Sequence, residues 1–101
     1  MAKLITVYWR DIPAQVIAKQ RRDSVKVPLS GRFADAIDRA AMRAGKGSSD
    51  AYLADWKRVS VNCSDDLKAE ADAAAAQLER EYDKDRLLVL IRNKGDEPEV
   101  G

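Results

Sequence analysis

The chain of 101 residues contains no histidine and a single cysteine, Cys63. The missing histidine excludes Ser-His and Cys-His nucleophile pairs, imidazole metal ligands and the commonest general base. One thiol cannot form an internal disulfide, which is typical of a protein from a reducing compartment. Carboxylates alone are a poor basis for a structural zinc site, so we expect neither a metal nor another cofactor.

Long apolar runs are also missing. No stretch approaches the roughly 18 consecutive apolar residues that span a bilayer, and the N-terminus enters a strand-like pattern without an apolar signal segment. We therefore expect a cytoplasmic protein with no membrane partner. The glycine-containing segment 45–49 lacks the spacing and the preceding strand of a phosphate-binding loop.

Apolar residues make up 46% of the chain and charged residues 35%, a balance typical of globular proteins. The length predicts a single domain over residues 1–95, folded alone or as a small oligomer, with a flexible tail at 96–101. Residues 1–47 contain ten Lys/Arg and four Asp/Glu, whereas residues 48–101 contain eight and thirteen. Because the total is only +1, we expect the two halves largely to neutralise each other.

Several segments have the alternating, β-branched pattern of strands. Residues 3–10 are the first. Pro13 cannot donate to a sheet, so it should break the pairing at residues 11–13 before a second strand over 14–20 completes a hairpin. Residues 24–27 can extend the sheet, and a further strand is expected near 58–62.

Apolar residues at helical spacing predict two main helices, over residues 31–44 and 65–82, with Ser30 and Ser64 as N-caps. A shorter helix is expected near 50–56. The apolar segment 86–92 suits either a buried strand or a short helix, because periodicity does not separate them. An N-cap at Asp83 or Asp85 and a stop at Gly95 favour a helix near 85–92.

These elements predict an α+β fold. A small, mainly antiparallel sheet, built from the early hairpin and the strand near 58–62, should carry the helices at 31–44 and 65–82 on one face. The other face is then available as a contact surface.

One segment sets a large indole, a guanidinium, a carboxylate and a proline at the end of the first strand. Adjacent strand residues point to opposite faces, so Arg10 and Asp11 each need a partner elsewhere. In one interpretation this segment is a docking surface with Trp and Arg anchors. In the other, Trp9 closes the core and its neighbours fix the turn. The candidate partner-binding residues are Trp9, Arg10, Asp11, Pro13 and Gln15.

A second candidate is a basic patch around the second turn, formed by Lys19, Arg21, Arg22, Lys26 and Arg32. These cations could meet the phosphates of a nucleic acid, although the aromatic residues that stack bases are missing there. A solvated loop is the simpler interpretation.

Cys63 precedes a helix N-terminus, where exposed amides can activate a thiol. The neighbouring Asp65 and Asp66 oppose a thiolate, and a small apolar role is the commoner one for a lone cysteine. The nearby carboxylates Asp65, Asp66, Glu70 and Asp72 spread around a helix instead of converging on a cation.

The strings VYWRDIPAQV at residues 7–16, FADAIDRAAMRAG at 33–45 and DAYLADW at 50–56 resemble the short bacterial proteins that carry the "virulence factor" domain. The resemblance covers roughly residues 3–92. It implies a stand-alone cytosolic protein of alphaproteobacterial type, often encoded beside folate- and corrinoid-dependent methyl-transfer enzymes such as methylenetetrahydrofolate reductase and the parts of a divided methionine synthase.

No catalytic residues are carried over by this resemblance. We therefore expect a non-enzymatic accessory or adaptor protein for such methyl-transfer enzymes, acting by binding another protein. The alternative is a small nucleic-acid-binding module that uses the basic turn.

Overall fold

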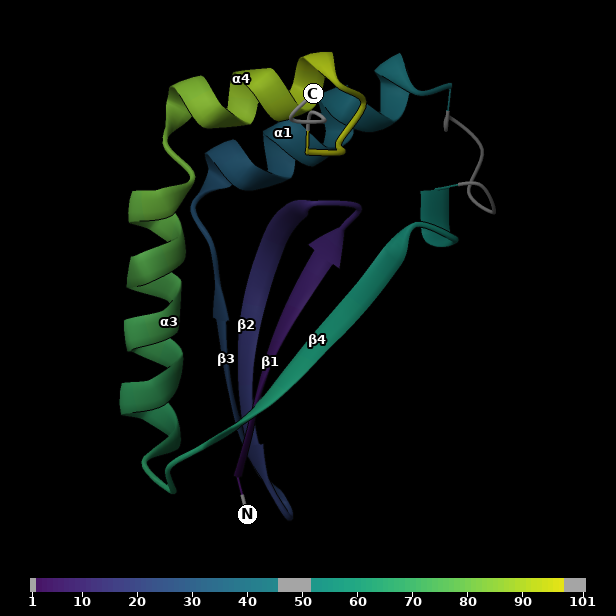
Figure 1. The fold of residues 1–101 in the computed structure, drawn as a ribbon. Coiled ribbons are helices and arrows are strands. Elements are labelled where there is room, and N and C mark those ends of the chain that lie inside the picture. Colours follow the sequence, from purple (N-terminus) through teal and green to yellow (C-terminus); the bar gives the residue numbers. More distant parts are fainter. Residues whose placement is uncertain (1, 46–51, 98–101) are drawn as a thin grey trace.

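The computed structural model describes residues 2–45 and 52–97, which form one sheet and its covering helices (Figure 1). The strands are β1 (Ala2–Trp9), β2 (Ile12–Gln20), β3 (Asp23–Pro28) and β4 (Trp56–Cys63). They lie in the order β3-β2-β1-β4, and every neighbouring pair is antiparallel. The predicted α+β class with an antiparallel sheet is confirmed.

Three helices complete the described fold: α1 (Gly31–Arg43), α3 (Leu67–Glu81) and α4 (Lys84–Arg92). Helix α3 runs along one face of the sheet, while α1 and α4 lie together across its upper end (Figure 1). We expected α1 to share the face with α3. It lies across the end because its apolar side packs on α4 and on the β1–β2 turn.

Strand β2 begins at Ile12, before Pro13, and not after it as predicted. Pro28, the last residue of β3, pairs with Gln15, so β2 has a strand neighbour on only one side at Pro13. A proline is tolerated where no second ladder needs its missing N–H. A register shift follows, because Val7 pairs with Gln15 and Tyr8 with Pro13, leaving Ala14 as a bulge.

The helix ends show which capping predictions hold. Asp66, and not Ser64, caps α3, because its carboxylate accepts from Ala69 N. Ser30 occupies the N-cap position of α1, but its hydroxyl bonds to Glu79 instead of to the helix. Segment 86–92 is helical as favoured, with Asp83 accepting from Arg86 N.

The short helix expected near 50–56 falls partly outside the described residues. Residues 46–51 are not described; of residues 52–56, Tyr52 and Leu53 are helical and Trp56 is in a strand. Trp56 opens β4, where it pairs with Trp9 and meets the Tyr52 ring edge-on at 5.8 Å. Pairing with β1 therefore places Trp56 in a strand, at the end of the segment where a helix was expected.

Buried side chains form two clusters. The upper one joins the end of the sheet to α1 and α4 and contains Trp9, Ile12, Phe33, Ala36, Ile37, Ala40, Ala41, Tyr82, Leu87 and Leu90. The lower one joins α3 to the sheet and contains Ala2, Val16, Ala18, Leu67, Ala71 and Ala75. The large aromatic side chains concentrate in the upper cluster, so most of the buried area per residue lies there.

Gly95 lies directly against the Trp9 ring at the border of the upper cluster. Its φ is +95°, and a Cβ there would lie 2.7 Å from Trp9 Cζ3. We expect Gly95→Ala to cost about 2–4 kcal/mol in the free energy of unfolding, since left-handed strain adds to overpacking against a buried ring. Gly45→Ala is the matched control, because Gly45 has φ +72° and open space around it. It should cost only about 1–2 kcal/mol, and equal losses in urea unfolding would contradict this account.

Candidate functional site: the open face of the sheet

The Trp9 segment is built into the upper cluster. The Trp9 side chain is 0% exposed, its Nε1 donates to Tyr52 O at 2.9 Å, and its ring stacks on Tyr52 at 5.9 Å. Pro13 is also fully buried. Of the two interpretations of this segment, the structure shows the one in which Trp9 closes the core.

Arg10 and Asp11 form the β1–β2 turn and find their partners in distant segments. Arg10 has φ +53°, donates through Nε to Asp55 at 3.2 Å and through Nη1 to Lys94 O at 2.8 Å, and lies over the Trp9 ring. Asp11 accepts from Lys57 Nζ at 3.1 Å and from Glu97 N at 2.7 Å. These contacts fix the turn and also hold residues 96–97, which were expected to belong to a frayed tail.

The Asp11 carboxyl is electrostatically tuned by these contacts. The hydrogen bond from Glu97 N lowers the pKa of Asp11 below its ordinary value of 3.8, and Lys57 lowers it further against the opposing effect of partial burial. Asp11 therefore stabilises the turn in its charged form.

Among the candidate residues of this segment, Gln15 lies on another surface, the face of the sheet opposite α3. Side chains alternate along a strand, so the face opposite α3 carries every second residue. Strand pairing places there Lys3, Ile5 and Val7 of β1, Gln15, Ile17 and Lys19 of β2, Ser24 and Lys26 of β3, and Trp56, Arg58, Ser60 and Asn62 of β4. We call this surface the open face, since α3 lies on the other side of the sheet (Figure 1).

Two hollows lie on the open face. One, of about 460 Å³, is lined by Val7, Gln15, Trp56, Lys57 and Arg58. The other, of about 300 Å³, is lined by Ile5, Ile17, Lys19, Ser24, Lys26 and Arg58. Because Arg58 lines both, we treat the two adjoining hollows together as one groove; its aliphatic floor is Ile5, Val7 and Ile17, and its open-face cations are Lys19, Lys26 and Arg58.

The charges of the open face differ from those of the rest of the molecule. Its strand residues include four cations, Lys3, Lys19, Lys26 and Arg58, and no carboxylate. Within residues 2–45 and 52–97, the ion pairs join helix, turn and tail residues and Lys57, which lies on the other face of β4; those between the two halves of the chain include Arg10–Asp55, Arg32–Glu79 and Lys57–Asp11. Of the four cations on the open face only Lys3 has a hydrogen-bond partner in those ranges, Asn62. Neutralisation between the two halves of the chain thus takes place away from the open face.

The predicted basic patch is divided by the fold. Lys19 and Lys26 lie on the open face, while Arg21 and Arg22 form the exposed β2–β3 turn. Arg32 lies elsewhere, bound to Glu79 and stacked over Phe33 at 4.9 Å. Sequence reasoning missed Arg58 and Trp56 as members of this surface. The alternation in β4 is visible in the sequence, but its pairing with β1 is needed to assign a face.

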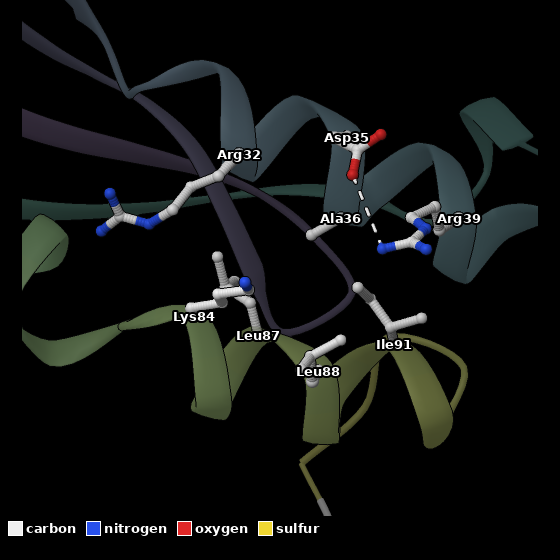
Figure 2. Close-up of a pocket in the computed structure, with 8 residues that line it drawn as sticks. All are labelled: Arg32, Asp35, Ala36, Arg39, Lys84, Leu87, Leu88 and Ile91. Atoms are coloured by element: carbon white, nitrogen blue, oxygen red, sulfur yellow. Dashed lines mark ion pairs between the residues drawn. The ribbon is translucent and has the colours of Figure 1, made fainter.

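A smaller cleft lies between α1 and α4 (Figure 2). It measures about 180 Å³ and is lined by Arg32, Asp35, Ala36, Arg39, Lys84, Leu87, Leu88 and Ile91. Arg39 pairs with Asp35 at 3.8 Å, and Arg32 is held by Glu79. Since two of its three cations are already paired and its volume is small, this cleft is a weaker candidate than the open face.

Cys63 ends β4 as a half-buried free thiol. Burial raises the pKa of this thiol above its ordinary value, and the nearby Glu70 and Asp65 raise it further. The structure therefore gives no support to an activated thiolate. Across the described part of the chain, no group of three or more Asp, Glu or Cys side chains is arranged to hold a metal ion, and none of the helices there is long and apolar enough to cross a membrane.

The fold and the open face define a small α+β protein whose sheet has one basic face that none of the described helices covers. The chain belongs to the family described as "Virulence factor", which matches residues 7–91. The resemblance seen in the sequence is thereby confirmed at the level of the family. No curated protein and no solved structure matches the chain.

The Asp11 contacts predict a pH-dependent contribution to stability. We expect Asp11→Asn to lower the free energy of unfolding by about 1 kcal/mol at pH 7, after allowing for solvent screening at this partly exposed site. A carboxyl whose pKa is lowered by folding stabilises above its unfolded value, 3.8, and this stabilisation is lost as pH falls through the folded value. In urea unfolding, the difference between the native protein and the variant should therefore shrink as the pH is lowered below 3.8. Asp35→Asn is the control, since Asp35 forms only an exposed pair with Arg39.

The raised pKa of Cys63 predicts slow alkylation. At pH 7.5, iodoacetamide should modify Cys63 in the folded protein several-fold more slowly than in the urea-unfolded chain, because less thiolate is present and the sulfur is partly covered. Faster reaction in the folded state would instead indicate an activated nucleophile.

Proposed function

We propose that this protein is a non-enzymatic adaptor that binds an acidic partner protein through the open face of its sheet. One observation carries the proposal: the groove has an aliphatic floor of Ile5, Val7 and Ile17, surrounded by cations that have no acidic neighbour on the same face. Charged side chains normally find partners or remain in water, so a face with one sign of charge around an apolar floor fits a complementary, acidic surface.

The residues available for chemistry support binding over catalysis. The chain has no histidine, and its one cysteine is held away from the thiolate form. The groove offers amide, indole, ammonium and guanidinium groups, which recognise and orient but do not readily abstract a proton at neutral pH.

A protein partner fits the groove better than a nucleic acid. Surfaces that bind single strands present aromatic rings along the groove, on which successive bases stack. Here the corresponding positions on the central strands β1 and β2 are Ile5, Val7 and Ile17, and Trp56 lies at one end only. An aliphatic floor instead suits the apolar ridge of a helix or strand whose flanking residues are acidic.

The partner's identity is the narrower part of the proposal. The family resemblance indicates a cytoplasmic role beside folate- and corrinoid-dependent methyl-transfer enzymes, and we propose that the acidic partner surface belongs to one of them. This part rests on the resemblance, whereas the proposed binding face rests on geometry.

Binding of purified methylenetetrahydrofolate reductase and methionine synthase subunits from the same genome tests both parts. By isothermal titration calorimetry, the double variant Lys26→Glu/Arg58→Glu should bind at least about tenfold more weakly than the native protein, because reversal converts attraction into repulsion. The matched control is Lys84→Glu/Arg92→Glu on α4, which changes the net charge equally on another surface. Equal weakening by the two double variants would remove the open face as the site, while absence of any binding to these enzymes would remove only the named partners.

The nucleic-acid alternative keeps one supporting observation, the unpaired Lys19 and Lys26 beside the Arg21–Arg22 turn. It requires a gel shift at low ionic strength that weakens with added salt. If DNA and RNA oligonucleotides are not retarded at about 20 mM salt, this alternative is excluded.

A further inference from the structure

We propose that β4 is the interface for a second copy of this chain, joining two sheets edge to edge into one antiparallel sheet of eight strands. This inference does not rest on the proposed adaptor function. It follows from the different ways in which the two edges of the sheet are built.

An edge strand exposes unpaired backbone N–H and C=O groups, and proteins normally block such edges with charge, proline or short length. Edge strand β3 has all three: it spans six residues, contains Lys26 and ends at Pro28, and α3 lies against it. Edge strand β4 spans eight residues, and its segment from Val59 to Cys63 contains neither a charge nor a proline. Within the described ranges β4 pairs only with β1, and its outer edge faces away from the helices (Figure 1).

The exposed side chains of β4 are self-complementary in one register. If two copies pair antiparallel around Ser60, Val59 of each lies directly opposite Val61 of the other. Val59 and Val61 are 47% and 53% exposed in the single chain, unusually high for aliphatic strand residues. The pairing places four valines together on the α3 side of the joined sheet, where cross-strand β-branched pairs stabilise a ladder.

Charge favours the same register. Lys57 and Arg58 begin β4, and Asp65 and Asp66 follow its end. Antiparallel pairing around Ser60 sets Arg58 opposite Asn62 of the second copy and brings the basic start of each strand toward the acidic turn after the other strand. Within Trp56–Cys63, this register sets no two like charges directly opposite each other.

A two-fold axis through Ser60 runs perpendicular to the sheet, so both open faces lie on the same side of the dimer. The two grooves then form one continuous basic surface, with the Arg58 side chains of both copies near its centre. The dimer therefore offers twice the cationic surface of the single chain to any acidic partner.

Disulfide trapping and sedimentation test the inference. In a Cys63→Ala background, Ser60→Cys should cross-link rapidly under mild oxidation, because directly paired residues have Cα atoms about 4.5–5.5 Å apart, within disulfide range. Ser24→Cys on β3 in the same background is the control and should remain largely monomeric at the same protein concentration. The native protein should sediment at twice its 11.2 kDa mass at about 100 µM, whereas Val59→Lys/Val61→Lys should sediment at the single mass.

Cross-linking of Ser60→Cys no faster than that of Ser24→Cys would overturn the β4 interface, even if the native protein dimerises through another surface. A native protein that sediments as a monomer up to about 1 mM would overturn the inference as well. Because the two valines are half exposed, the lysine variant should keep the circular dichroism of the folded chain. If it unfolds, the cysteine pair still decides the question.

Discussion

The burial of Trp9 is the interaction on which the rest of this structure depends. Its ring lies between Tyr52 and Gly95, and its indole N–H is satisfied by the Tyr52 carbonyl, so the largest side chain of the core has no unpaired polar atom. Around it, Arg10 and Asp11 tie the first turn of the sheet to segments more than forty residues away. A two-residue turn thereby organises the end of the sheet, the start of β4 and the chain after α4.

This arrangement explains why the distinctive segment around Trp9 is not the part of the surface most accessible to a partner. Arg10 and Asp11, next to the buried indole, close the turn. Their charged groups are paired with Asp55 and Lys57 or hydrogen-bonded to the backbone of residues 94–97. The surface with unsatisfied charge lies instead on the opposite side of the sheet from α3. There the cations come from four different strands, and none stands out in the sequence.

Much of the fold could be predicted because its signals are local. Strand alternation, the apolar stripes of α1 and α3, and the acidic N-cap and glycine stop of α4 each depend on residues close in the chain. The errors occurred where a distant contact decides the outcome: Trp56 joins β4 because it pairs with Trp9, and Pro13 lies inside β2 because β3 has already ended. The open face required the same long-range information, since Arg58 and Lys26 share a surface only through the register of β1 and β2.

The alanine residues of α3 carry no recognisable motif, yet they determine how closely this helix lies to the sheet. Ala71 and Ala75 are buried against β-strand residues as small as Ala2 and Ala18, so backbone approaches backbone with little between. Any larger residue at those two positions would act as a wedge and tilt the whole helix off the sheet. A stretch of small, unreactive side chains is thus under a tight limit on size.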